Sequence, residues 1–227
     1  MEAKALTVCV NYSDLLRISI LNKRLFDILV VTSLEDTATQ EFCKQTETQY
    51  IIADPKHNNA IFNKGKLINT AIQALDHKDW ILIFDSDILI PPNVVNQLNN
   101  LDPECIYGMK RKMVYTPLDL ELYARGDRSR LQTWEDDYMF ENGTEKLPGC
   151  FHLFHTKHNR LYPEGFRHAG FSDSAFSKLW PQPNRRILDG YCLHFGKPVR
   201  NWYGRRSQKF VIRRRTVKRL AAMVEYL

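Results

Sequence analysis

The chain has 227 residues and a mass of 26.6 kDa, enough for one or two domains whose core needs no disulfide or metal support. Hydrophobic residues make up 44% and charged residues 26%, which excludes a disordered chain, and no apolar run is long enough to cross a membrane. The net charge of +6 is concentrated in Arg205–Arg219, which holds only basic charges, so nucleic acid is not an expected partner of the fold as a whole.

The first half of the chain alternates apolar strand segments with amphipathic helices. In Asn63–Leu75 apolar residues recur on one face with the period of a helix, and Asn63 can cap its start. Trp80–Phe84 is entirely apolar, as is typical of a central strand buried on both faces. This alternation predicts an α/β fold with a mixed, mainly parallel central sheet flanked by helices. The expected strands are Leu6–Asn11, Asp27–Thr32, Tyr50–Ala53 and Trp80–Phe84, and the expected helices are Leu15–Arg24, Thr37–Gln45 and Asn63–Leu75.

The second half is less regular. Met109–Leu147 is polar and has no clear period, so we expect a long functional loop or lid. The tail Arg205–Leu227 has an apolar stripe opposite its basic residues, which predicts a C-terminal basic amphipathic helix. The stripe could pack on the domain or lie in a bilayer interface, and its Val, Leu and Ala content favours packing. Further strands are expected at Pro148–Phe154 and Tyr191–Phe195, and a short helix at Ser172–Leu179.

Cysteine usage and the N-terminal residues bear on the compartment. The five cysteines are scattered and form no CxxC pair, so we expect reduced, mostly buried thiols. No signal peptide precedes the first apolar segment, Leu6–Val10. We therefore expect a cytoplasmic protein. Contact of residues 205–219 with an anionic membrane would place it at the inner membrane face.

Two carboxylates directly follow the apolar strand Trp80–Phe84, in the sequence Asp85-Ser86-Asp87. Strand side chains alternate, so Asp85 and Asp87 project to the same side, at a carboxyl-terminal strand end where open α/β sheets bind ligands. Carboxylates this close repel each other unless a cation joins them. Mg²⁺ and Mn²⁺ prefer oxygen ligands, and Mg²⁺ combines one or two carboxylates with substrate phosphates. The motif therefore favours a metal-phosphate site over a capped turn.

An ordered set of motifs resembles the GT-A glycosyltransferases, most closely the small, inverting, family 2-like enzymes that use nucleotide sugars. The set comprises Asn63-Lys64-Gly65 with Asn69 on one helix, the strand ending in Asp85-Ser86-Asp87, then Gly170–Asp173 and Leu193–Gly196. The resemblance implies a GT-A (Rossmann-like) catalytic domain over residues 1–204 and a basic helix over 205–227. Within the domain, residues 1–108 would bind the nucleotide sugar and residues 109–204 the acceptor.

The resemblance also implies roles for individual residues. Asp87, Asp85 and His194 would hold Mn²⁺ or Mg²⁺ against the two phosphates of the donor, although Asp85 could contact the ribose instead. Tyr12 could stack on a uracil base, or it could be a packed surface tyrosine. Turn, cap or solvent-exposed roles remain the alternatives for the others. The residues expected around the donor are Asn11, Tyr12, Asp54, Lys66, Asn69, Asp85, Ser86 and Lys197.

Asp173 is the expected catalytic base. Inverting sugar transfer needs a carboxylate that takes the proton of the acceptor hydroxyl. Asp173 follows Gly170 at the start of a helix, where these enzymes place their base, but Ser172-Asp173 could equally cap the helix. Ser172 replaces the usual first carboxylate of a pair, and His194–Pro198 also resembles retaining enzymes, so inversion is expected and retention remains open.

The expected function is metal-dependent transfer of a sugar from a nucleotide diphospho-sugar, with UDP favoured, to a hydroxyl of a glycan or lipid-linked acceptor. A nucleotidyltransferase acting on sugar phosphates is the alternative, since it also uses paired aspartates and Mg²⁺ on an α/β sheet. That class needs a Gly-rich or Lys-rich phosphate loop after the first strand, and Asn11–Asp14 offers none.

Overall fold

The structure is a computed structural model that describes residues 3–56, 59–75, 79–133, 147–196 and 213–225. In these residues the strands are β1 (Ala3–Val8), β2 (Asp27–Thr32), β3 (Gln49–Ile52), β4 (Trp80–Asp85), β5 (Ile88–Leu89), β6 (Ile106–Val114), β7 (Gln132–Thr133), β8 (Phe151–His155) and β9 (Arg185–Phe195). The α-helices are α1 (Ser13–Ser19), α2 (Thr37–Gln45), α3 (Lys64–Ala74), α4 (Val94–Gln97), α5 (Pro117–Tyr123), α6 (Ser172–Ser177) and α7 (Arg214–Glu225). Short 3-10 helices are η1 (Ile20–Arg24), η2 (Leu98–Asn100), η4 (Thr156–His158) and η5 (Gln182–Asn184).

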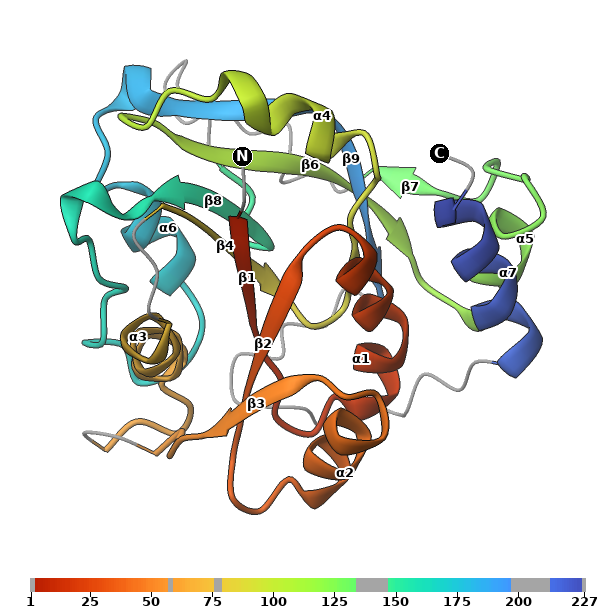
Figure 1. Cartoon of the computed structure of the whole chain (residues 1–227), viewed down its shortest axis with the longest axis horizontal. Coiled ribbons are helices and arrows are strands. Elements are labelled where there is room, and N and C mark those ends of the chain that lie inside the picture. Colours follow the sequence, from red (N-terminus) through yellow and green to blue (C-terminus); the bar gives the residue numbers. More distant parts are fainter. Residues whose placement is uncertain (1–2, 57–58, 76–78, 134–146, 197–212, 226–227) are drawn as a thin grey trace.

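One mixed sheet organises the fold, in the order β3-β2-β1-β4-β8-β6-β9-β5, with β7 paired to β6 (Figure 1). The first four strands of this order are parallel, and β8 is antiparallel to both β4 and β6. β9 runs parallel to β6, and β5 antiparallel to β9. The expected α/β sheet flanked by helices is confirmed, with antiparallel strands entering after β4. Because β1 pairs with β4 in a register that matches Val8 with Asp85, the segments after both strands leave the sheet at one edge.

The starts of α2 and α3 follow from their caps. α2 begins after Asp36, whose carboxylate accepts the Thr39 N–H at 3.1 Å, and α3 begins after Asn63, whose amide oxygen accepts the Lys66 N–H at 2.9 Å. β2 and α2 have the predicted bounds. The helix predicted over Leu15–Arg24 is shorter, because α1 ends at Ser19 and continues as η1.

The loop predicted over Met109–Leu147 is wrong in its first part. β6 continues to Val114, although its centre is the charged Lys110-Arg111-Lys112, because it pairs with β9 through this stretch. α5 follows, with a capping box in which Thr116 and Asp119 exchange hydrogen bonds. Residues 134–146 lie outside the described residues. The boundary predicted between residues 108 and 109 falls inside β6.

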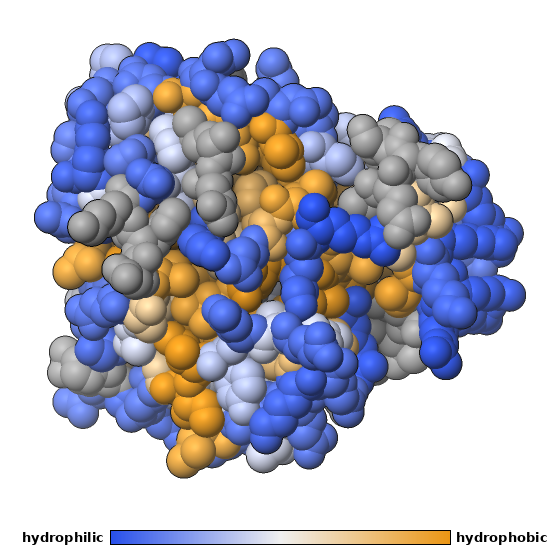
Figure 2. Space-filling model, in the orientation of Figure 1, coloured by the Kyte–Doolittle hydropathy of each residue, from blue (hydrophilic) through white to orange (hydrophobic). Residues whose placement is uncertain are grey.

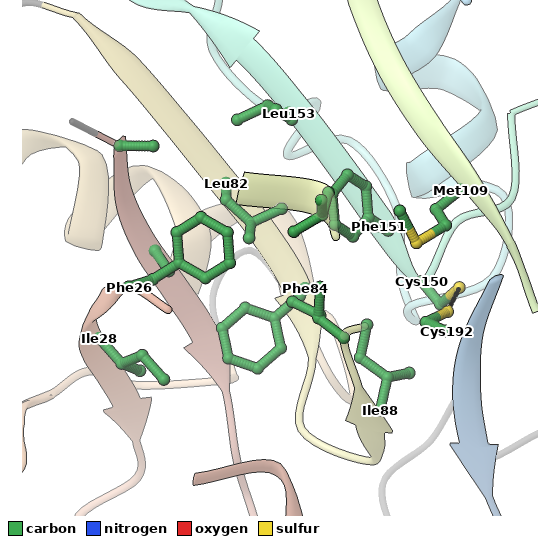
Figure 3. Packing of buried hydrophobic residues seen from close by; sticks show 14 of the residues in the cluster. Phe26, Ile28, Leu82, Phe84, Ile88, Met109, Cys150, Phe151, Leu153 and Cys192 are labelled. Atoms are coloured by element: carbon green, nitrogen blue, oxygen red, sulfur yellow. Dashed lines mark hydrogen bonds between the residues drawn. The ribbon is translucent and has the colours of Figure 1, made fainter. Parts of the chain in front are cut away.

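Two apolar clusters cover opposite faces of the sheet. One contains Phe84, Phe151 and Leu153 from the strands, which are labelled in the close view (Figure 3), and it packs against α1 and α2. The other packs α3 and α6 on the opposite face, with Phe176 among its fully buried side chains. Burial on both faces makes β4 a rigid support for the carboxylates at its end.

All five cysteines are buried and free, as expected. The Cys150 and Cys192 sulfurs lie 3.8 Å apart (Figure 3). Of the helices that the structure describes, none is long and apolar enough to span a bilayer.

The C-terminal helix α7 packs on the domain beside α5 and α1 (Figure 1). Thr216 and Leu220 are buried, and Leu220 joins an apolar cluster with residues of α1, α5 and β9. The side chain of Arg24 donates a hydrogen bond to the Ala221 carbonyl. The apolar side of α7 thus contacts the domain over its described side chains, while residues 205–212 of the predicted helix lie outside the described residues.

Candidate active site

Hydrogen bonds from α1, η1 and β9 to its backbone fix the loop that carries Asp85 and Asp87. The Ser19 hydroxyl donates to the Ser86 carbonyl at 2.8 Å, and Ser86 is buried. The buried Asn22 amide donates to the Ile88 carbonyl at 3.1 Å and accepts the Ile90 N–H at 2.9 Å. The Phe195 N–H donates to the Asp87 carbonyl at 2.8 Å, which ties the loop to the end of β9.

The loop brings Asp85, Asp87 and His194 together. One potential ligand atom from each lies within 4.8 Å of the others. His194 pairs in register with Ile88 across the β5–β9 ladder, and its Nε2 lies 3.3 Å from Asp87 Oδ1. His194 Nδ1 is buried and has no hydrogen-bond partner among the described residues. Two carboxylates and an imidazole form a donor set that could hold a divalent metal ion, and the two carboxylates are the oxygen ligands that Mn²⁺ and Mg²⁺ prefer.

The protonation state of His194 opposes metal binding at neutral pH. Burial lowers the pKa of His194, but the adjacent Asp87 carboxylate raises it further, to about 9. The imidazole is therefore protonated near pH 7 and must lose its proton before it can act as a ligand.

We expect Mn²⁺ binding near pH 7 to release about one proton, and the affinity to rise with pH up to about 9 and to level off above it, where the free imidazole becomes neutral. Calorimetry in buffers of different ionisation enthalpy measures the proton count. The variant His194→Gln should bind the ion more weakly and without this proton. Wild-type binding with no proton release would remove His194 from the ligand set.

Lys64, the first residue of α3, links the group Asp85–Asp87–His194 to Asp173, the predicted base. Its Nζ lies 2.8 Å from Asp85 Oδ1 and 2.8 Å from Asp173 Oδ1, and only 10% of its side chain is exposed. Burial lowers the pKa of Lys64, but the two carboxylates raise it above its usual range, so the ammonium stays charged. Burial raises the pKa of Asp85, and the Lys64 ammonium more than offsets this, leaving it below its usual range.

Replacing Lys64 by methionine is expected to lower the free energy of unfolding by about 3 kcal/mol near neutral pH, because two partly buried carboxylates lose their shared cation. Lys64 lowers the folded pKa of Asp85, so its contribution is present above pH of about 4 and is lost as the pH falls through the lowered pKa. The stability difference from wild type should therefore narrow in acid. Urea unfolding across pH measures it, with Lys66→Met on the same helix as the matched control. Equal stability of Lys64→Met and wild type at neutral pH would contradict the bridging role.

Asp173 does not cap α6. The N-cap is Phe171, which makes no side-chain cap bond, and the Asp173 carboxylate points instead to Lys64 and Tyr162. Lys64 Nζ and the Tyr162 hydroxyl both donate to Oδ1. Gly149 lets the carboxylate approach, because a Cβ there would lie 2.6 Å from Asp173 Oδ2. Burial raises the pKa of Asp173, which Lys64 lowers and Asp85 raises, and the net shift is upward, toward the range useful to a base at neutral pH.

Hydrogen bonds from the Asn69 side chain hold the segment that contains Tyr162. Its amide nitrogen donates to the Tyr162 carbonyl at 2.9 Å and to Glu164 Oε1 at 2.7 Å, and its oxygen accepts the Tyr162 N–H at 2.8 Å. Gly65 allows the same close contact, since a Cβ would lie 2.2 Å from the Pro163 carbonyl oxygen. Asn69, predicted to face the donor, is buried and has both its N–H groups bound to the protein.

The other residues predicted to bind the donor lie around this centre or away from it. Asn11 has a left-handed backbone with φ of 62°, is exposed, and donates its N–H to Asp36 Oδ2 at 2.6 Å. Tyr12 is half-buried at the start of α1, and Asp54 is exposed and accepts the Lys56 N–H at 2.8 Å. Lys66 lies half-buried in the first turn of α3, and Lys197 lies outside the described residues.

No protein-family model and no curated protein matches the sequence. Solved structures do match the fold. The crystal structure of S. aureus TarS 1-349 aligns with a TM-score of 0.55 at 15% identity, over 87% of this chain and 60% of that chain. This chain therefore spans less than two thirds of the TarS fragment.

Two further structures cover nearly the whole chain. Glucosyl-3-phosphoglycerate synthase from Mycobacterium tuberculosis, in complex with uridine-diphosphate, aligns with a TM-score of 0.52 at 10% identity, over 99% of this chain and 80% of that chain. The inositol-1-phosphate CTP transferase from T. maritima aligns with a TM-score of 0.53 at 9% identity, over 99% and 96%. These likenesses establish a GT-A-like, Rossmann-like α/β fold.

Proposed function

We propose that this protein is a metal-dependent glycosyltransferase that moves a sugar from a nucleotide diphospho-sugar, with UDP favoured, to a hydroxyl of a glycan or lipid-linked acceptor. The observation that carries the proposal is the linked pair of sites, in which Lys64 bridges the Asp85–Asp87–His194 cluster and the partly exposed Asp173. The similarity in fold to a synthase crystallised with uridine-diphosphate supports a UDP donor.

In this proposal each group of residues has a separate role. Asp85, Asp87 and His194 would hold Mn²⁺ or Mg²⁺, which when bound neutralises the diphosphate that leaves. Asp173 takes the proton of the acceptor hydroxyl as that oxygen attacks the sugar carbon. Because Lys64 and Tyr162 both donate to Oδ1, Oδ2 remains to accept this proton. Inversion is the outcome that one base and direct attack give, and retention is the alternative.

Asn11 and Tyr12 would bind the base of the donor. The register of β1 with β4 supports this, because it brings the segment after β1 to the sheet edge that carries Asp85. Asp54, Lys66, Ser86 and Lys197 complete the proposed donor contacts, and Asn69 would act through Tyr162.

The second candidate is a nucleotidyltransferase that joins a nucleoside triphosphate to a sugar phosphate. The T. maritima CTP transferase, which shares the fold over nearly its whole length, favours it. The two reactions differ in their products, because sugar transfer releases a nucleoside diphosphate, whereas nucleotidyl transfer releases pyrophosphate.

The distinguishing experiment is mass spectrometry after incubation with Mn²⁺ and either a panel of nucleotide diphospho-sugars or matched triphosphates with sugar 1-phosphates. Release of UDP or another diphosphate with loss of the donor sugar supports the proposal. Pyrophosphate release together with a new nucleotide sugar would replace it with the second candidate.

The basic helix α7 is proposed to attract an anionic membrane or a lipid-linked acceptor. Thr216 and Leu220 are buried against the domain, whereas Arg214, Lys218 and Arg219 are exposed. Figure 2 shows hydrophilic residues along the outer edge of the molecule where α5 and α7 lie in Figure 1. Glu121 on α5 pairs with Arg215 at 3.0 Å, so part of the charge is already neutralised.

Co-sedimentation with vesicles containing anionic lipid should be strong at low salt and fade at high salt, because each basic residue near such a surface contributes about 1 kcal/mol that salt screens. The triple variant Arg214→Glu, Lys218→Glu and Arg219→Glu should lose this binding, and Arg186→Glu on β9 is the matched control. Equal binding to neutral vesicles would contradict the electrostatic account.

A further inference from the structure

Lys64 places a positive charge in direct contact with one of the proposed metal ligands. Its Nζ lies 2.8 Å from Asp85 Oδ1, and only 10% of its side chain is exposed. An ammonium group and a divalent metal ion are both attracted to a carboxylate, and they repel each other when they lie close together. Lys64 and a metal ion therefore compete for Asp85.

The backbone on both sides of Lys64 holds the ammonium at this place. Asn63 is buried, and its amide nitrogen donates to the Glu164 carbonyl at 2.9 Å. A Cβ on Gly65 would lie 2.2 Å from the Pro163 carbonyl oxygen, so the first turn of α3 contacts this segment directly. Most lysines extend their charged end into water, whereas these contacts keep the charged end of Lys64 beside Asp85.

A second carboxylate gives Lys64 a partner when Asp85 binds a metal ion. Lys64 Nζ also lies 2.8 Å from Asp173 Oδ1, to which the Tyr162 hydroxyl donates as well. Burying a charge is costly when it has no partner. Because Asp173 remains as a partner, Lys64 can stay in place while Asp85 exchanges one cation for another.

The charges of these side chains determine how strongly a metal ion is attracted. Asp85 and Asp87 contribute two negative charges to the cluster, and Lys64 offsets one of them. Mg²⁺ gives up its water reluctantly and is usually bound by one or two carboxylates together with substrate phosphates. The two phosphates of a nucleotide diphosphate supply the negative charge that Lys64 takes from the cluster.

We propose that Lys64 is a positioning residue that holds Asp85 in the metal-free protein and lowers the affinity for Mn²⁺ or Mg²⁺, so that the ion binds firmly only together with a nucleotide diphosphate. The ion then enters with the donor and leaves with the nucleoside diphosphate. This inference rests on the proposed function and adds the control of its metal site by the nucleotide.

The first test measures the Mn²⁺ affinity of the full chain without nucleotide, by titration calorimetry. Lys64→Met and Lys64→Gln both remove the positive charge, and each should bind Mn²⁺ at least about 10-fold more tightly than wild type, because a like charge close to the ion is lost. Glutamine keeps an N–H group that can donate to Asp85 and Asp173, so it serves if methionine destabilises the fold too far. A lysine with a structural role only would not lower the metal affinity.

The second test measures the Mn²⁺ that remains bound after gel filtration in metal-free buffer. Wild type should lose the ion when the buffer contains no nucleotide and retain it when the buffer contains UDP. Lys64→Gln should retain more Mn²⁺ than wild type without UDP. Atomic absorption gives the metal content in each case, so neither test depends on activity.

Two further variants show whether the charge is responsible. Lys64→Arg keeps the positive charge and should bind Mn²⁺ about as weakly as wild type. Lys178→Met removes an exposed lysine directly after α6 and should leave the Mn²⁺ affinity unchanged.

The outcomes separate this inference from the proposed function. Mn²⁺ affinity that is unchanged or weaker in both neutral variants would overturn the role of Lys64 alone. Lys64→Arg binding as tightly as Lys64→Gln, or equal Mn²⁺ content of wild type with and without UDP, would also overturn it. Failure of wild type to bind Mn²⁺ even with UDP would instead overturn the proposed metal-dependent function, and this inference with it.

Discussion

Replacing Asp87 by asparagine is expected to abolish metal-dependent binding of UDP. The change keeps the shape of the side chain but removes one of two carboxylates that face His194, so the diphosphate loses the cation that would offset its charge. Mn²⁺ affinity should fall by more than the factor of about 10 to 100 that is lost when a residue hydrogen-bonded to a metal ligand is removed. Titration calorimetry with UDP and Mn²⁺ measures both affinities.

Two comparisons sharpen this result. His194→Ala should weaken binding less than Asp87→Asn, because it removes a ligand without removing a negative charge. Asp189→Asn changes an exposed carboxylate on the same strand as His194 and should bind UDP and Mn²⁺ as wild type does. Wild-type affinity in Asp87→Asn would contradict the metal assignment.

Replacing Asp173 by asparagine is expected to lower turnover by a factor of about 10² to 10⁴, the usual contribution of a positioned general base. Asparagine keeps an oxygen for Lys64 and Tyr162 but cannot take the acceptor proton. Donor affinity should be retained, because the metal cluster is intact. Steady-state kinetics with separate calorimetry of UDP binding distinguishes the two effects.

Tyr162→Phe provides a graded comparison. It retains the stacking of Tyr162 on Phe176, whose ring centroids lie 4.3 Å apart, and removes only the hydroxyl that donates to Asp173. Losing one hydrogen bond to a charged group should cost about 10- to 100-fold in turnover. Ser174→Ala, on helix α6 next to Asp173, is the control. A wild-type rate in Asp173→Asn would show that this carboxylate has a structural role only.

The metal cluster was predictable from sequence because local patterns determine most of it. The apolar run of β4 places Asp85 at a strand end, and Asp87, two residues later in the turn between β4 and β5, lies close to it. His194 has no such local signal, since it reaches the cluster through the β5–β9 pairing across more than a hundred residues. Only the ordered resemblance to known enzymes predicted its position.

Lys64 and Tyr162 were not predicted to belong to the site. Lys64 and Lys66 both open α3, and helical periodicity places Lys66 with Asn69, opposite the apolar face. The structure instead buries Lys64 between two carboxylates, because α3 meets β4 and α6 at its first turn. Tyr162 lies in an irregular segment without periodicity, and its contact with Asp173 depends on the Asn69 amide, a tertiary contact that no local pattern encodes.

Strand β6 shows why part of the fold could not be predicted from the sequence. Its centre, Lys110-Arg111-Lys112, interrupts the apolar pattern from which strands are predicted. Pairing with β9 on one side and β7 on the other supplies the backbone hydrogen bonds that the side-chain pattern does not indicate. The capping box of Thr116 and Asp119 was, by contrast, a readable signal for α5.

The most direct test of the central claim is a crystal structure with UDP and Mn²⁺, in which anomalous scattering locates the ion. The account predicts one Mn²⁺ bound by Asp87 and His194, with Asp85 in direct or water-mediated contact and the diphosphate oxygens completing its coordination. UDP bound without a metal, or Mn²⁺ bound away from Asp85, Asp87 and His194, would contradict the claim that these residues form a metal-diphosphate site.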